Sequence, residues 1–596
     1  MPSKATTPAP PVAHLAAAIV AACAAMIVLR AVAATTTSNW LWGLNTLRYW
    51  GPPDAVAVVA FAAAGLVPPV ARAIEALLAR WGDAWSRRVV VGDALIAGLV
   101  AAITWMLRDA VQFTGDFDLR VGALTTVLDL GKLFPQAFPL DSLLNLHFAR
   151  WLVARGVAPE NALQGIGAGV AFTFTIGVAR FARGLGCRGA VLPATVLVLV
   201  AGGWMPHFAG YEKYGPLLAG LVFAASGFVR LAAGRAGEWE LALGTLVCAA
   251  THRAGLAVVP ASLLAMALAW HAAPAVRRTP LMHAGLVLLG GIAALIPLAW
   301  HVLTTVDRSV HLPGGAVAQT FETSGEADTL VRIADTLNGL FFLAPLWPAG
   351  LVAWWFGRGN GEPRPAAGRP SRALLALPVL VAILSQLALL LVIRATRGGG
   401  RDWDASTAPA LTVALAAVGA LGLAWPRAAR AGAIAPVVTL ALACAATSWA
   451  LHANPAMNLA RIRTQLAAAP AWSATSLSFA HDQVGVYHMS RGEHAAAAAE
   501  FERAFALAPN PRYAYQAGLA NYHAGRRGAA SASFREVIAR NAAVADPWGG
   551  LARIALDEGD TLAAAAFADS ALRRNPNHVV ARAVHGEIAR GRGGRF

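Results

Sequence analysis

The amino-acid sequence predicts an all-α protein, in which a polytopic bundle of about 13 membrane-spanning helices precedes a soluble α-solenoid. The first observation is composition: of 596 residues, 57% are hydrophobic and 13% are charged, whereas soluble domains are typically about 25% charged. The second is a change of composition after about residue 452, where a helical repeat begins. We therefore expect a membrane domain over 1–451, a linker over 452–477 and a repeat domain over 478–596.

Thirteen apolar stretches approach or exceed the length needed to cross the roughly 30 Å hydrocarbon core of a bilayer. The stretch 239–251 is short and is followed closely by the next, so one broken or re-entrant unit is an alternative there. The first stretch also fits a signal peptide, because Ala31 to Ala33 form a small-residue site, although Arg30 interrupts its apolar run. The stretches lie near 13–34, 54–71, 92–107, 161–179, 191–205, 215–232, 239–251, 255–272, 281–300, 338–356, 373–393, 408–425 and 432–451.

Basic residues predict the orientation of the bundle, since arginine and lysine accumulate in short cytoplasmic loops. Connections after the even-numbered stretches are rich in arginine, whereas the long connections 108–160 and 301–337 mix basic with acidic residues. This pattern predicts a cytoplasmic amino terminus and an extracytoplasmic repeat domain. The net charge is +16, and the basic residues are scattered among apolar segments. This scattering argues against a nucleic-acid partner. We interpret the charge as a signal of membrane topology and of contact with anionic membrane lipid. The alanine- and arginine-rich usage is typical of high-GC bacterial genes, so we expect the cytoplasmic (inner) membrane.

The carboxyl-terminal repeat has a period of 33 to 34 residues. Gly492, Gly525 and Gly559 fall in register, as do Ala504, Val537 and Ala571. Small residues at fixed positions let paired helices approach closely, and stacked pairs bury a shared core. Over roughly Ser478 to Arg590 the pattern resembles tetratricopeptide repeats; a helical hairpin array of another type is the alternative. Three such repeats predict a binding or docking module.

Two aspartates, Asp116 and Asp118, open the first long loop on the predicted outer face. The loop continues with apolar residues at helical spacing, interrupted at Pro135 and Pro139, which predicts two helices lying along the membrane surface. A carboxylate sheltered beneath such helices suits a general base. A solvated turn or a helix cap is the structural alternative.

This organisation resembles the GT-C superfamily of membrane glycosyltransferases, from Gly92 to about Leu451. The combination with tetratricopeptide repeats is similar to that of membrane O-mannosyltransferases carrying such repeats. The resemblance implies transfer of a sugar from a polyprenyl-phosphate donor to an extracytoplasmic protein or envelope glycan, with Asp116 or Asp118 as the base. The Asp-Phe-Asp spacing departs from the simplest pattern and leaves open which aspartate acts, although Asp116 is preferred because it lies nearer the span.

Three further outer loops supply candidate residues for binding the lipid-linked phosphate or the substrate, and each has a structural alternative. Glu212 and Lys213 lie in a tyrosine-containing loop that also fits an aromatic anchor at the interface. His252 and Arg253 lie at the end of a short hairpin, where the arginine also fits a snorkelling role. The most charge-dense loop, which otherwise fits a flexible solvated turn, contains the phosphate-binding candidates Arg394, Arg397 and Arg401, with Asp402 and Asp404 to orient them.

No cofactor is certain from the sequence. The chain has no HExxH motif and no Cys/His cluster at zinc-ligand spacing. A divalent cation held by Asp116 and Asp118 together with a substrate phosphate is chemically feasible. The four cysteines lie in or beside apolar stretches, so no disulfide framework is expected.

Two other classes of function stay open. A transporter or lipid flippase would also need many spans, but it would more often show paired halves with discontinuous helices, and the sequence shows no such internal symmetry. A non-catalytic scaffold would use the bundle only to anchor the repeats. The enzyme hypothesis differs from both in requiring a cavity that is open to lipid and lined by the acidic and basic loop residues.

Overall fold

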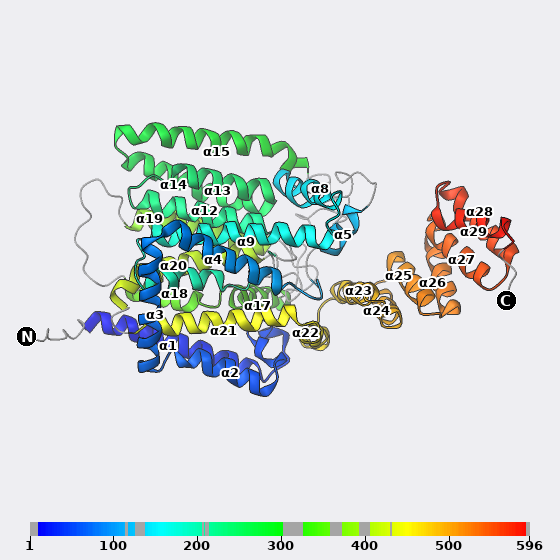
Figure 1. Ribbon diagram of the computed structural model, residues 1–596, viewed down its shortest axis with the longest axis horizontal. Helices are drawn as coiled ribbons and strands as arrows, with labels where there is room; N and C mark the ends of the chain where they lie inside the picture. Colours follow the sequence, from blue (N-terminus) through cyan, green and yellow to red (C-terminus); the bar gives the residue numbers. More distant parts are fainter. Residues whose placement is uncertain are drawn as a thin grey trace, which may run out of the picture. The chain divides into compact units, whose positions relative to one another are not determined.

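The computed structural model describes most of the chain, and the regular secondary structure of the described residues is entirely helical. A first compact unit ends at Pro470 and a second begins at Ala471. The two units are drawn in Figure 1. The described residues are 10–113, 117–125, 137–205, 208, 214–301, 326–357, 372–392, 406–428 and 432–591.

Seven helical segments among the described residues are long and apolar enough to cross a membrane, and nine when two bent pairs each count as one span. By helix length and hydropathy this is a multi-pass membrane protein. The count of about 13 stays a prediction. The seven comprise α1 (Pro10–Ala33), α4 (Val89–Met106), α9 (Pro159–Gly184), α12 (Tyr214–Ala232), η4 with α14 (Arg253–Val258 and Val259–Ala272), α15 (Ala275–His301) and α21 (Ile434–Ala453).

Further helices complete the bundle. The apolar helix α10 has only ten residues, and α13 has 14, both short of the roughly 20 residues that a full span needs. These helices are α10 (Val191–Val200), α13 (Glu238–Thr251), α19 (Arg372–Val392) and α20 (Thr407–Ala428).

Two of the predicted spans are sharply bent. Helix α2 (Pro52–Ala64) turns by 77° into α3 (Pro68–Arg87), where Pro68 and Pro69 open the new helix. Proline suits a first helical turn, but within a continuous helix it removes a hydrogen bond and clashes with the preceding turn. Helix α17 (Glu326–Leu343) is likewise bent from α18 (Trp347–Gly357), by 89° between their apolar parts. Figure 1 shows α3 crossing one end of the bundle, at a steep angle to its neighbours.

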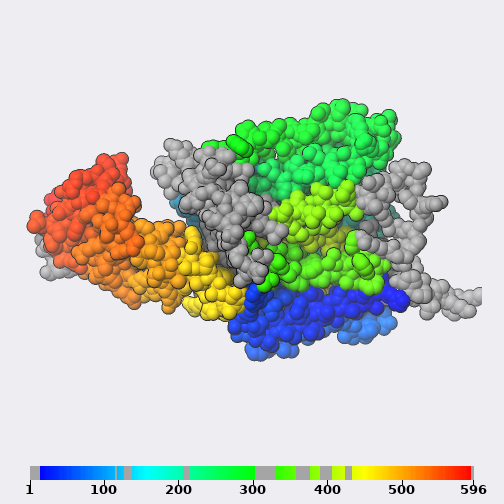
Figure 2. Space-filling view, turned by 180° about the vertical axis from the view of Figure 1, so that it is seen from behind, coloured from blue at the N-terminus to red at the C-terminus, as the bar shows by residue number. Residues whose placement is uncertain are grey.

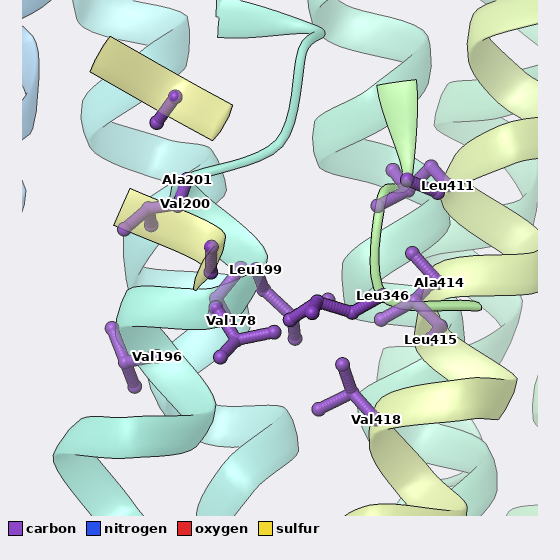
Figure 3. Close-up of a cluster of buried hydrophobic side chains, with 14 of the residues drawn as sticks. Val178, Val196, Leu199, Val200, Ala201, Leu346, Leu411, Ala414, Leu415 and Val418 are labelled. Carbon is purple, nitrogen blue, oxygen red and sulfur yellow. The ribbon is translucent and has the colours of Figure 1, made fainter. Parts of the chain in front are cut away.

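The core of the first unit is built from aliphatic side chains and close helix contacts. Val178 of α9, Leu199 of α10 and Val418 of α20 lie in one buried cluster, with Leu346 beside them (Figure 3). Helices α12 and α13 approach so closely that a Cβ atom on Gly244 would lie 2.4 Å from the Ala224 backbone nitrogen. Small residues permit this approach, which is how helices gain packing contacts in lipid.

The predicted surface loop after α4 contains short helical segments in its described part. They are held to the start of α9 by a small apolar cluster that includes Phe117, Leu124, Ala149 and Leu163. In Figure 1 α5 and α8 lie at one end of the bundle. The segments are α5 (Phe117–Leu124), α7 (Pro139–Asp141), the π-helix η3 (Ser142–Phe148) and α8 (Ala149–Val153).

The second unit is a series of helices joined by short turns. Gly492, Gly525 and Gly559 occupy three of these turns with φ of 73°, 76° and 84°, the left-handed region that glycine adopts without strain. The positive φ therefore explains the glycine spacing physically, while the assignment to tetratricopeptide repeats stays a prediction. The helices are α23 (Ala474–Ser490), α24 (His494–Leu507), α25 (Pro511–His523), α26 (Arg527–Arg540), α27 (Asp546–Asp557), α28 (Thr561–Arg574) and α29 (Val579–Ala589).

The predicted linker 452–477 is partly helical. Helix α22 (Pro455–Ala467) belongs to the first unit and packs against α21 and the 3-10 helix η2 (Asn45–Tyr49). Asn454 caps α22, accepting hydrogen bonds from the backbone N–H groups of Ala456 and Met457. Residues before the repeats thus contribute to the membrane unit.

Candidate functional site

The first turn of α5 presents an unusual carboxyl group. The Asp118 side chain reaches solvent, but it is surrounded by enough protein that its carboxylate is partly desolvated. Burial, followed by repulsion from Asp109 and Glu160, raises the pKa of Asp118 to about 6. A carboxyl group with this pKa is a stronger base than an ordinary aspartate, yet it is still mostly ionised at pH 7.

Asp109 shapes the turn that leaves α4. Its Oδ1 atom accepts hydrogen bonds of 2.8 Å from the backbone N–H groups of both Val111 and Gln112. Gln112 adopts a φ of 53°, a conformation that costs an L-residue about 1 kcal/mol or more. The two hydrogen bonds hold this strained turn, and Ala110 donates its N–H to the carbonyl of His452 at 2.9 Å. The loop before α5 is therefore fastened to the end of α21.

A buried polar network continues from this turn into α22. Asn458 donates to Asp109 at 3.4 Å, and the His452 Nε2 atom lies 3.5 Å from Arg461 Nη1. Because a guanidinium only donates, Nε2 is the acceptor, so Nδ1 carries the proton and donates to the Ser448 carbonyl at 2.8 Å. Arg461 also lies over the Phe342 ring, 5.2 Å from its centroid. The network orders the helix ends around Asp109 with a neutral histidine.

An ion pair fixes α5 itself. Arg120 donates to both carboxylate oxygens of Asp141, at 3.0 and 2.9 Å, and the two side chains are 3% and 4% exposed. Asn145 donates a further bond of 2.9 Å to the same carboxylate. Two parallel bonds define the relative orientation of the groups as well as their distance. The pair therefore anchors the helix carrying Asp118 to α7.

The carboxyl end of α4 and the start of α9 are joined by Arg108, which donates to the Gln164 side chain at 2.7 Å. Beneath this end lies a narrow cavity. Its walls are mostly apolar, so it offers few partners to a polar substrate. The lining residues are Ile103, Thr104, Leu107, Met205 and Trp449.

His252 and Arg253 lie at the break between α13 and η4, as the sequence predicts for the end of a short hairpin. His252 caps η4, its Nδ1 atom accepting the backbone N–H of Ala254 at 3.2 Å. Its ring centroid is 5.3 Å from that of Tyr214. The capping role gives His252 a structural function and occupies its Nδ1 atom. Because α7 packs against α13, the break and the Arg120–Asp141 pair belong to the same end of the bundle.

The structure describes only part of the predicted site. Asp118, His252 and Arg253 are described, and the proximity of Asp118 to Asp109 and Glu160 is new. Within the described ranges no three His, Cys, Asp or Glu side chains form a group able to hold a metal ion. The predicted site residues that lie outside the described residues are Asp116, Glu212, Lys213, Arg394, Arg397, Arg401, Asp402 and Asp404.

Sequence reasoning missed the groups that hold this end of the bundle in place. Arg120, two residues after Asp118, is the nearest signal, because an arginine beside apolar residues in a membrane protein needs a partner. Nothing in the local sequence identifies Asp141 as that partner, or Asn458 as a partner of Asp109, 349 residues away. Protein-family models and curated protein sequences yield no match to this chain.

Proposed function

We propose that this protein is a membrane glycosyltransferase that moves a sugar from a polyprenyl-phosphate donor to a protein or envelope glycan outside the cytoplasm. The supporting observation is Asp118, a carboxyl group with a pKa of about 6 near two other acids at one end of a multi-pass bundle. Perturbed pKa values of this kind are concentrated at functional sites. The proposal includes an amino terminus in the cytoplasm and an inner-membrane location.

The reaction is a single displacement that inverts the anomeric centre. The acceptor hydroxyl oxygen bonds to the anomeric carbon, its proton passes to a carboxylate, and the bond from that carbon to the phosphate oxygen breaks. Asp118 is about nine-tenths ionised at pH 7 if its pKa is about 6, so it is present mainly in the form that accepts the proton. Asp116 is the alternative base.

The leaving group is a polyprenyl phosphate, whose growing negative charge requires compensation. Arg253 is the described candidate, with Lys213, Arg394, Arg397 and Arg401 completing the proposed set. Arginine suits this role because its planar guanidinium makes paired hydrogen bonds to phosphate oxygens. Glu212, Asp402 and Asp404 are proposed to orient the sugar or these arginines, and the repeat helices to bind the acceptor or a partner protein.

The proposal is tested by mass spectrometry of envelope glycans and glycoproteins. Cells lacking the gene are complemented with the natural protein, Asp118→Asn, Asp116→Asn or the control Asp54→Asn. Asp54 is an exposed acid in the first turn of α2, so its loss changes charge without touching the site. We expect glycan transfer to fall by about 10² to 10⁴ in the variant lacking the base.

Equal protein levels in the membrane fraction are the necessary control. Loss of transfer in one aspartate variant, with Asp54→Asn unaffected, identifies the base. Full transfer by both Asp116→Asn and Asp118→Asn would exclude the proposed mechanism and favour a scaffold, in which the bundle anchors the repeat helices without catalysis.

A further inference from the structure

A buried cation lies on a different part of the bundle. Arg30, in the last turn of α1, is 6% exposed, and its Nη2 atom donates to the carbonyl of Phe341 at 2.5 Å. That carbonyl belongs to the end of α17, where helical carbonyls have no partner within the helix. Within the part of the chain that the structure describes, Arg30 makes no ion pair, and its Nε atom has no hydrogen-bond partner.

Such a group is expensive in a membrane protein. Arginine costs about 2.5 to 3.5 kcal/mol at the centre of a span on insertion scales and less near its end, where Arg30 lies. The bond to Phe341 satisfies one N–H group, but a carbonyl does not neutralise the positive charge. A bound anion would neutralise this charge.

A small, open crevice lies beside Arg30, between α1, η2, α2 and α21. Thr46 also borders it; this residue is 2% exposed, and its hydroxyl has no partner among the described residues. Two residues that line this crevice thus carry a buried donor without a partner among the described residues, Arg30 Nε and Thr46 Oγ1. The third polar residue, Thr447, already donates its hydroxyl to the Cys444 carbonyl at 2.8 Å. The remaining lining is apolar: Ile27, Leu47, Val58, Val59, Ala62, Leu440, Ala443 and Cys444.

The surroundings indicate an anion attached to a hydrocarbon chain. Helices α1 and α2, blue in Figure 2, form one edge of the first unit, and α15, green, forms the opposite edge. Large apolar side chains on α1 and α2 are exposed, among them Val28 at 61%, Val32 at 60% and Phe61 at 47%. In a membrane such side chains face lipid. Acyl chains fit this surface, whereas a free inorganic anion gains nothing from it.

We propose that the crevice binds the phosphate of a resident anionic phospholipid. Arg30 Nε and Thr46 Oγ1 donate to the phosphate oxygens, and the acyl chains lie along α1 and α2. The lipid would neutralise Arg30 and stabilise the contact between α1 and the end of α17. None of the lining residues belongs to the candidate catalytic group, so this lipid is distinct from the proposed sugar donor and does not depend on the proposed function.

The test uses the full chain, purified in detergent and observed by native mass spectrometry with added phosphatidylglycerol, phosphatidylcholine, polyprenyl phosphate or inorganic phosphate. The variants are Arg30→Gln and Thr46→Val. Arg48→Gln is the matched control, because Arg48 is a nearby arginine whose side chain is exposed. We expect one phosphatidylglycerol per natural chain and per control chain, with affinity about tenfold lower in Arg30→Gln and lowered to a smaller extent in Thr46→Val.

Thermal unfolding and gel filtration establish that each variant is folded, and Thr46→Val provides the comparison if Arg30→Gln does not fold. Phosphatidylglycerol, but not phosphatidylcholine, should raise the melting temperature of the natural protein. Equal binding of the two phospholipids, natural affinity in either folded variant, or full competition by inorganic phosphate would each overturn the proposal. Preferential binding of polyprenyl phosphate would also overturn it and assign the crevice to the sugar donor.

Discussion

The buried ion pair between Arg120 and Asp141 makes a prediction that does not depend on catalysis. The side chains are 3% and 4% exposed, so removal of either partner takes the opposite charge away from a group that is held out of water. We expect Arg120→Met and Asp141→Leu each to lower the free energy of unfolding of the first unit by about 3 to 5 kcal/mol. The double variant leaves no lone charge and should cost less than either single change.

The control is an ion pair in the same unit that is open to solvent. Arg180 bonds Glu240, but its side chain is 43% exposed, and Glu240 retains Arg230 at 3.6 Å when Arg180 is removed. Arg180→Ala should therefore cost about 1 kcal/mol or less.

Denaturant unfolding of the purified protein in detergent measures all four variants. The coupling between the two sites is the difference between the double change and the sum of the single ones. Single changes costing under 1 kcal/mol, or a double variant as unstable as the sum of the single ones, would refute the buried pair as the anchor of α5.

Three further predictions follow from particular contacts. The rate of sugar transfer should rise with pH through about 6, as Asp118 ionises. Glu160→Gln should move this rise to lower pH, because it removes a negative charge near Asp118. A pH–rate profile of each protein checks both expectations. Gly525→Ala should destabilise the second unit by about 1 to 2 kcal/mol, because φ is 76° at this position. The control Gly528→Ala should be neutral or stabilising, because Gly528 lies in a helix with open space around it. Thermal unfolding of the second unit compares the two variants. Gly244→Val should separate α12 from α13, because even a Cβ atom would meet backbone at 2.4 Å, and the yield of folded protein from membranes should drop sharply.

Sequence and structure agree where the signal is local. Long apolar stretches such as Pro159–Gly184 and Tyr214–Ala232 are helices of spanning length, since in lipid every backbone polar group must be bonded within its own segment. The break at His252 also lies where the sequence predicts the end of a short hairpin, between two helical segments. Local patterns reveal such features because hydrophobicity, helix periodicity and proline or glycine positions act over a few residues.

The bends were harder to foresee. The stretch 54–71 reads as one span by hydropathy, yet Pro68 and Pro69 start a second helix at 77° to the first. Proline within an apolar run is also tolerated inside helices, as Pro378 is in α19. The packing around each proline, rather than its presence, decides between a bend and a continuous helix.

The sequence by itself determined the all-helical class, the membrane setting and the repeat period, because each follows from composition and spacing along the chain. Tertiary structure alone decided which charges meet. Asp118 gains its raised pKa from burial and from acids elsewhere in the chain, and Arg120 finds Asp141 across 21 residues. Arg30 meets the Phe341 carbonyl 311 residues away. Electrostatic energy depends on distance in space and on exclusion of water, and neither quantity is encoded in the spacing of residues along the sequence.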